Sequence, residues 1–304
     1  MTMSHDDTSS HIWASLRSNI LITIAKLAAA AWTRSGAMLA EGIHTGADAV
    51  NQLLLFQGLR EASKPPDAEH PLGHGRSAYF WSFMVALFMF LGGGVFAVYE
   101  GIQHIVHPEP VRNLPVAIGI LGLSLLLDCW ITYGNIREFN RRRGTQGFVA
   151  HLLHTKDSNL VVVFGENAAA VLGLAIALTA LVLAQVTGDP RYDAAGTLLV
   201  GVVLIGVAVF LAVEIKSLLA GESADPQIAE ALRDEVESDG RFHGVLTVIT
   251  IQQGPGEVLV AAKVRLDESL DTRGLVTAIN ELERRLKARC SEIRWLFIEP
   301  DDAE

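Results

Sequence analysis

Residues 40–58 read AEGIHTGADAVNQLLLFQG, an apolar segment of helical length with a histidine and a carboxylate in its middle. His44 and Asp48 are four residues apart, so a helix places both side chains on one face, about one turn apart. A charge at membrane depth costs about 2.5 kcal/mol or more, so such a residue usually faces a bundle interior or a water-filled path. Imidazole and carboxylate are also a standard ligand pair for divalent metal ions. The pair predicts an intramembrane ion site, and a helix–helix hydrogen bond without an ion is the alternative.

The composition of the whole chain is that of a membrane protein with several spans. Of its 304 residues 50% are hydrophobic, the mean hydropathy is +0.33, and the apolar residues come in long blocks. The polar start of the chain and the length of the first apolar block predict no cleavable signal peptide. The two cysteines, Cys129 and Cys290, provide neither a disulfide framework nor a Cys-based zinc site.

Six hydrophobic segments predict an α-helical membrane protein with six transmembrane helices. Their approximate limits are Leu16–Trp32, Gly36–Leu59, Ala78–Val106, Leu114–Phe139, Leu160–Val186 and Ala194–Leu219. Lys and Arg residues gather in the loops after the second and fourth segments, whereas the opposite loops hold only Arg34, Arg112 and Arg191. By the positive-inside rule we expect both termini in the cytoplasm. We also expect the membrane to be a bacterial plasma membrane.

A soluble domain follows Gly221 in the sequence. Two β-rich runs are separated by QQGPGE, a hairpin signal, and helical patterns lie on both sides. The predicted elements are a helix over Asp225–Val236, strands over Val245–Ile251 and Val258–Leu266, a helix over Leu270–Arg289 and a strand over Ile293–Ile298. We therefore expect a transmembrane domain over residues 1–221 and a small cytoplasmic α+β domain over residues 222–304.

The second predicted domain is acidic. Residues 222–304 contain 10 Lys and Arg residues against 18 Asp and Glu residues, so this domain carries −8 of the total formal charge of −10. An acidic soluble region excludes nucleic acid as the expected partner and is compatible with handling cations.

The loop after the second segment completes a specific pattern. It reads SKPPDAEHPLGHGR over residues 63–76 and carries Asp67, His70 and His74. Six helices, His-x-x-x-Asp in the second helix, this loop motif and a small C-terminal α+β domain together resemble the cation diffusion facilitator family of divalent-metal/proton antiporters. The resemblance covers about Leu16 to Pro300, and the combination of the two motifs is highly specific.

The resemblance implies a transport site between the second and fifth helices, and His44 and Asp48 match the second-helix positions. The fifth helix departs from the family's common His-x-x-x-Asp pattern, because KDSNLVVVFGENAAAVLGLAIA contains no histidine. Glu166 and Asn167 are its only polar residues at suitable depth. In the fourth segment an acid, Asp128, lies about midway through an otherwise apolar span. These features resemble a divergent branch of the family, related to the mitochondrial zinc transporter.

The metal ligands that the resemblance implies are His44, Asp48 and Glu166, completed by Asp128 or Asn167. One histidine with two or three carboxylates is a harder ligand set than two histidines with two aspartates. It suits Zn²⁺ and also tolerates Mn²⁺, Co²⁺ or Fe²⁺. For Asp128, a buried acid bonded to a hydroxyl such as that of Thr132 is the alternative.

The resemblance also supports a second metal site on the cytoplasmic loop, formed by Asp67, His70 and His74. A solvated polar loop is the alternative reading of these residues. His151, His154 and Asp157 lie just before the fifth helix, where they either assist the loop site or belong to a wet surface.

The C-terminal region resembles the family's metallochaperone-like, ferredoxin-like dimerisation domain, which implies a homodimer. Where zinc-binding relatives place histidines, this chain has Thr247, Lys263 and Phe297, so we expect dimerisation without bound metal.

The function that the resemblance implies is that of a secondary transporter in the lipid bilayer. It exports a divalent transition metal, zinc first, from the cytoplasm in exchange for protons. A membrane metal receptor or scaffold without transport is the alternative. An enzyme is not expected, because the membrane segments contain no Ser/Lys dyad and no His-Glu-x-x-His helix.

Overall fold

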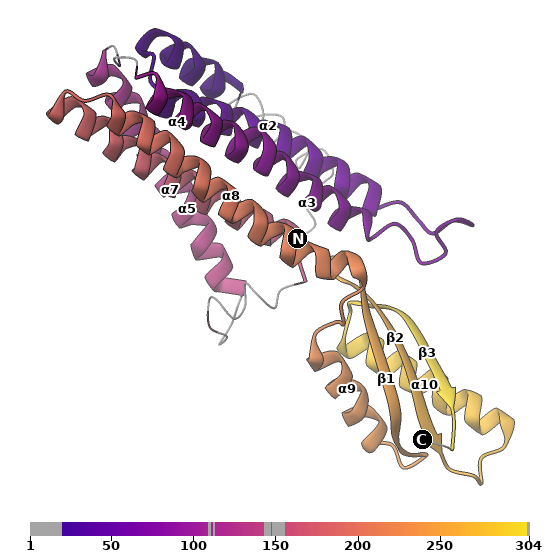
Figure 1. The fold of residues 1–304 in the computed structure, drawn as a ribbon. Coiled ribbons are helices and arrows are strands. Elements are labelled where there is room, and N and C mark those ends of the chain that lie inside the picture. The colour runs from indigo at the N-terminus through magenta and orange to yellow at the C-terminus, as the bar shows by residue number, and fades with distance from the viewer. Residues whose placement is uncertain (1–19, 109–110, 112, 143–146, 148–155, 303–304) are drawn as a thin grey trace. The chain divides into compact units, whose positions relative to one another are not determined.

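Figure 1 shows the fold in a computed structural model of the chain. The structure describes residues 20–108, 111, 113–142, 147 and 156–302. The chain divides into two compact units. The first holds the described parts of residues 1–57, 81–152 and 159–214, and the second holds those of residues 58–80, 153–158 and 215–304.

Long, mostly apolar helices build the first unit (Figure 1). They are Ile20–Thr33, α2 Gly36–Ala62, α3 Ser77–Phe88, η1 Met89–Val95, α4 Phe96–Val106, α5 Leu114–Arg142, α7 Ser158–Thr187 and α8 Arg191–Ala220. The segment η1 is a π-helical stretch that joins α3 to α4 without a break. The described part of each predicted hydrophobic segment therefore lies in a helical stretch.

Four of these helical segments are long and apolar enough to cross a membrane. They are Ser77–Val106, Leu114–Arg137, Ser158–Thr187 and Arg191–Ala220. The helix Ile20–Thr33 is apolar but shorter in its described part. The helix α2 has the length of a span, but polar residues in its middle lower its hydropathy. The structure thus establishes a mostly helical chain with four apolar candidate spans, and the six-span arrangement stays a prediction.

Close approach between helix backbones holds part of the bundle together. A side chain on Gly101 of α4 would place its Cβ 2.6 Å from the Leu198 backbone nitrogen of α8. One helical turn away along α8, a Cβ on Gly201 would lie 2.7 Å from the Val98 backbone nitrogen. Glycines at these positions let the two backbones touch, as packing in lipid requires.

A small α+β fold makes up most of the second unit. Its elements are α9 Pro226–Glu237, β1 Phe242–Gly254, β2 Glu257–Leu266, α10 Thr272–Arg289 and β3 Ile293–Pro300. The sheet order is β1-β2-β3, with β2 antiparallel to β1 and parallel to β3. This order of helices and strands is the predicted one. A sheet of three strands does not by itself establish the ferredoxin-like arrangement, which stays a prediction.

Local sequence signals explain where these elements begin and end. Asp225 caps α9 by accepting a hydrogen bond from the Gln227 backbone amide, and Pro226 occupies the first helical turn. Asp271 caps α10 in the same way through the Gly274 amide. Gly256, with φ of +71°, turns the chain between β1 and β2. Apolar residues of both helices and the sheet then share one core, which includes Leu232, Val260 and Leu282.

Candidate metal centre

The predicted pair in α2 lies inside the first unit. His44 is 2% exposed, and its Nδ1 lies 3.7 Å from Asp48 Oδ1. His44 Nε2 and Asp48 Oδ1 are buried without a hydrogen-bond partner among the described residues. A buried polar atom left in this state costs about 1–3 kcal/mol. These atoms therefore lack the helix–helix hydrogen bond that was the alternative to an ion site.

On the α7 side, Glu166 is held by a residue that the sequence analysis did not single out. Asn51 is fully buried on α2, and its Nδ2 donates to Glu166 Oε1 over 2.7 Å. The Glu166 and Asp48 carboxylates also lie close enough to interact electrostatically. Asn51 follows Asp48 by three residues, which places both side chains on the same helical face. This spacing is the sequence signal that could have identified Asn51 as part of the site.

Asn167 and Asp128, the two residues proposed to complete the site, differ in the groups with which they interact. Asn167 Nδ2 donates to the Val163 carbonyl of its own helix over 2.7 Å. Asp128 lies on α5 and interacts electrostatically with His44. The alternative partner for Asp128 was wrong, because the buried Thr132 hydroxyl has no hydrogen-bond partner within the described parts of the chain. The side chain of Thr132 therefore does not engage Asp128.

A buried ion pair next to this region was also missed. Lys26 Nζ lies 3.0 Å from Glu41 Oε1, and the two side chains are 4% and 1% exposed. Lys26 lies within the first apolar block, and Glu41 precedes His44 by three residues. Both positions were visible in the sequence as charges at membrane depth.

Four side chains of α2 thus form one row, which we call the α2 polar stripe. Its members are Glu41, His44, Asp48 and Asn51. Their spacings of three, four and three residues keep them on one helical face. Each has a buried polar atom without a hydrogen-bond partner among the described residues: Glu41 Oε2, His44 Nε2, Asp48 Oδ1 and Asn51 Oδ1. A row of buried atoms with free lone pairs is suited to binding a cation.

The structure does not gather the predicted intramembrane ligands into one coordination sphere. Among the described His, Cys, Asp and Glu side chains, the loop residues Asp67, His70 and His74 are the group of three whose ligand atoms all lie within 4.8 Å of one another. His44 and Asp48 lie 3.7 Å apart on α2 and Glu166 lies on α7, and the ligand atoms of these three residues do not all lie within 4.8 Å of one another.

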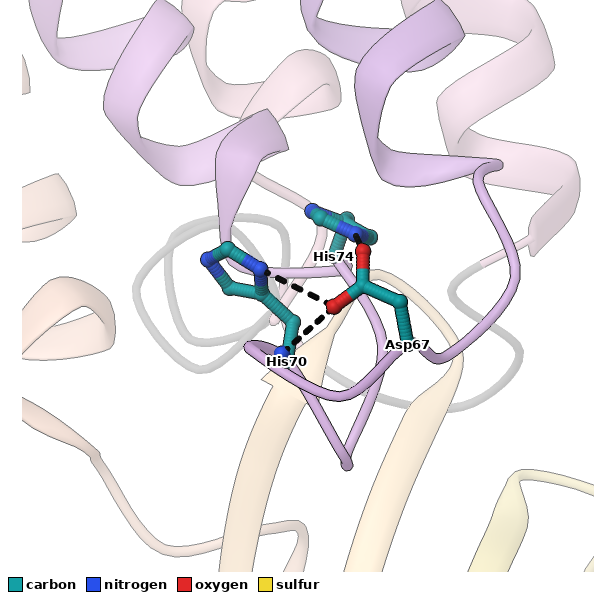
Figure 2. Close-up of side chains that lie close together, drawn as sticks. All are labelled: Asp67, His70 and His74. Atoms are coloured by element: carbon teal, nitrogen blue, oxygen red, sulfur yellow. Dashed lines mark hydrogen bonds and ion pairs between the residues drawn. The ribbon is translucent and has the colours of Figure 1, made fainter.

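The loop residues form a compact cluster, which we call the loop triad (Figure 2). His74 Nε2 lies 2.9 Å from Asp67 Oδ2, and His70 Nδ1 lies 3.4 Å from Asp67 Oδ1. Backbone amides of His70 and Glu69 also donate to Asp67 Oδ1. The hydrogen bond from the His70 amide, followed by that from His74, lowers the pKa of Asp67 to about 2. The carboxylate is therefore ionised at any physiological pH.

The loop triad is fixed against the α+β part of the second unit. Gly73 has φ of +74°, so the loop turns through a conformation that favours glycine. A Cβ on Gly75 would lie 2.8 Å from the Gln253 carbonyl oxygen and 3.2 Å from Gly254 Cα. Contact of the loop with the turn of the β1–β2 hairpin thus positions the triad. Of the three residues predicted to assist the loop site, His151 and His154 lie outside the described residues, and Asp157 is not part of the group of ligand atoms that the triad forms.

Known proteins resemble this chain over most of its length. Residues 12–220 match the cation efflux transmembrane domain. The chain is 33% identical over 251 residues to the mitochondrial proton-coupled zinc antiporter SLC30A9 of Xenopus laevis, covering 82% of this chain and 45% of that protein. It is 30% identical over 256 residues to metal tolerance protein C4 of Arabidopsis thaliana, covering 83% and 55%.

The match to a bacterial relative covers a larger share of that relative's length. The chain is 24% identical over 277 residues to the cation-efflux pump FieF of Serratia proteamaculans, which covers 91% of this chain and 86% of that pump. By contrast, the chain spans about half the length of the Xenopus and Arabidopsis relatives. Because the matching transmembrane domain covers more than half of this chain, the chain belongs to the cation diffusion facilitator family, whose members are transporters and not enzymes.

Proposed function

We propose that the protein is a secondary transporter with six transmembrane helices that exports a divalent transition metal, zinc first, from the cytoplasm in exchange for protons. The observation that carries the proposal is the α2 polar stripe with its buried unpaired atoms, of which Asp48 and Asn51 interact with Glu166 of α7. Family membership supports divalent-metal transport. The printed name of the Xenopus relative, a proton-coupled zinc antiporter, supports zinc and proton exchange at 33% identity.

We propose that His44, Asp48 and Glu166 are the principal ligands of the transported ion. Asp128 or Asn167 completes the set. Asp128 has the better support, because its carboxylate interacts electrostatically with His44, whereas the Asn167 amide bonds to its own helix. Mn²⁺, Co²⁺ and Fe²⁺ are alternative substrates, since one imidazole with several carboxylates does not exclude them.

Coupling to protons follows from the chemistry of these ligands. A metal ion needs a neutral imidazole and ionised carboxylates, so metal and protons compete for the same atoms. If the site opens alternately to the two sides of the membrane, binding of the ion on one side releases protons there. Binding of protons on the other side releases the ion. Drawing the separated α2 and α7 ligands together around the ion is then part of the transport cycle.

The remaining assignments concern topology and assembly. We propose that both termini, the loop triad and the α+β domain lie in the cytoplasm, and that the protein is a homodimer through this domain. The distribution of Lys and Arg among the loops supports the topology. The expected bacterial plasma membrane remains a prediction, and the Xenopus relative is named as mitochondrial.

One experiment distinguishes a zinc transporter from a protein that only binds zinc. A membrane metal receptor or scaffold binds zinc but does not move it. Purified protein reconstituted into liposomes with an acidic lumen should accumulate zinc, and dissipating the pH gradient should stop the accumulation. Zinc binding to the purified protein without accumulation would favour the receptor.

The loop triad gives a prediction for pH. Replacing Asp67, His70 and His74 together with Ala should remove one zinc ion per protomer and leave most of the uptake rate. In the Asp48→Ala protein, where the loop is the remaining site, zinc affinity should fall as the pH drops from neutral to mildly acidic, because protons compete with zinc for the imidazole nitrogens. Protonated imidazole cannot bind metal, whereas Asp67 stays ionised down to about pH 2.

Isothermal titration with zinc at several pH values measures this loss, using the triple Ala variant as the control. An affinity that stays constant between neutral and mildly acidic pH would contradict histidine ligation in the loop. So would a triple variant that keeps its full zinc content.

A further inference from the structure

The buried pair Lys26–Glu41 is outside the ligand set discussed so far. Lys26 Nζ donates to Glu41 Oε1 and to Thr45 Oγ1, each over 3.0 Å. The Thr45 hydroxyl donates in turn to the Glu41 carbonyl oxygen over 3.0 Å. A buried ion pair is often no more stable than packed apolar side chains of similar size. Stability alone therefore does not account for two charges in the middle of an apolar bundle.

Glu41 has one oxygen that the pair does not use. Oε2 is buried and has no hydrogen-bond partner in the described part of the chain. A Cβ built on Gly173 of α7 would lie 3.9 Å from it, so Oε2 points at a place on α7 where there is no side chain. His44, three residues along the same face, has its unpaired Nε2 buried as well. An acidic oxygen and an imidazole nitrogen are thus both free about one turn apart.

Lys26 also acts on the proposed ligands beyond Glu41. Its ammonium interacts electrostatically with Asp48 of α2 and Asp128 of α5. A fixed cation among these carboxylates partly neutralises them when no metal is present. It also repels a divalent ion that approaches them, because like charges at short range in a low-dielectric medium interact strongly.

We propose that Glu41 is an additional metal ligand next to His44, and that the Lys26 ammonium occupies this carboxylate until a metal ion displaces it. The inference rests on the proposed transport function. Glu41 lies closer than His44 or Asp48 to Gly36, where α2 begins. In the predicted topology this is the exit side, so an ion leaving Asp48 passes to His44 and Glu41. The tethered ammonium competes with it there and favours its release.

Zinc affinity in Lys26 variants tests this competition. The loop triad is first replaced with Ala so that zinc at the membrane site alone is measured, by competition with a fluorescent chelator at about pH 8, where protons compete least. In this background Lys26→Met should bind zinc about tenfold or more tightly, because the competing charge is gone. Lys26→Arg keeps the charge and should resemble the parent. Adding Glu41→Gln to Lys26→Met should remove most of the gain, because the ligand that Lys26 had occupied is then lost.

If the Lys26–Glu41 pair has a purely structural role, the variants should behave differently. Lys26→Met would then lower the unfolding temperature without tighter zinc binding, and this result would overturn the proposal. A gain in affinity that survives Glu41→Gln undiminished would overturn it too. If Lys26→Met does not fold, Lys26→Gln removes the charge while keeping a hydrogen-bond donor, and the same outcomes apply.

A parallel uptake assay keeps this test separate from that of the transport function. Zinc uptake that persists in Asp48→Ala overturns the proposed function itself. Loss of uptake in Asp48→Ala, together with unchanged zinc affinity in Lys26→Met, overturns only the role assigned to Lys26 and Glu41.

Discussion

Liposomes containing the Asp48→Ala variant are expected to take up zinc at the background rate of empty liposomes. Asp48 supplies the carboxylate next to His44, and its buried Oδ1 has no other partner among the described residues. Loss of even an outer-shell partner of a metal ligand costs about 10–100-fold in affinity or activity, so loss of a ligand should cost about 100-fold or more. Initial rates of zinc accumulation measure the effect.

Asp67→Ala is the matched control, because it removes a carboxylate that belongs to the loop triad. This control should keep most of the uptake rate. Size-exclusion chromatography should show the same folded assembly for both variants, since removing a charge from a polar cluster leaves the apolar packing of the bundle intact. Normal zinc flux in Asp48→Ala would contradict the site assignment.

The second large effect is expected from His44→Asp, which should shift transport from zinc toward manganese. The substitution replaces the imidazole with an oxygen ligand, and an all-oxygen site suits Mn²⁺ better than Zn²⁺. We expect the ratio of zinc to manganese uptake to fall by about tenfold or more. Proton dependence should persist in part, because the carboxylates still exchange protons for metal. Parallel uptake of the two ions, each across a range of pH, measures both properties.

His243→Asp provides the control for this change, because His243 is an exposed residue of β1 and lies outside the helices that carry the proposed ligands. It should leave the metal preference unchanged. An unchanged preference in His44→Asp would show that His44 does not contact the transported ion.

The sequence predicted the elements of this fold because the signals that define them are local. Long apolar blocks locate the helices, and the QQGPGE turn between two β-rich runs locates the hairpin. Asp225 and Asp271 cap the two helices of the α+β domain close to their predicted starts. The loop triad was found in the same way, since its three residues lie within one short motif.

The intramembrane site could be predicted only in part, because it depends on contacts between helices. The partnership of Asn51 with Glu166 and that of Lys26 with Glu41 join residues far apart in the chain. Spacing along one helix also cannot show that the Thr132 hydroxyl makes no hydrogen bond among the described residues.

The most direct test of the central claim is the proton movement that accompanies zinc uptake. Liposomes containing the protein and a lumenal pH indicator are given external zinc, and lumenal pH is recorded. We predict that zinc influx raises the lumenal pH as protons leave. The apparent zinc affinity should fall as the external pH drops from about 7 to 5.5, because protons compete with zinc for its ligand atoms. Zinc influx without a change in lumenal pH, or an affinity that is constant across this range, would contradict the account.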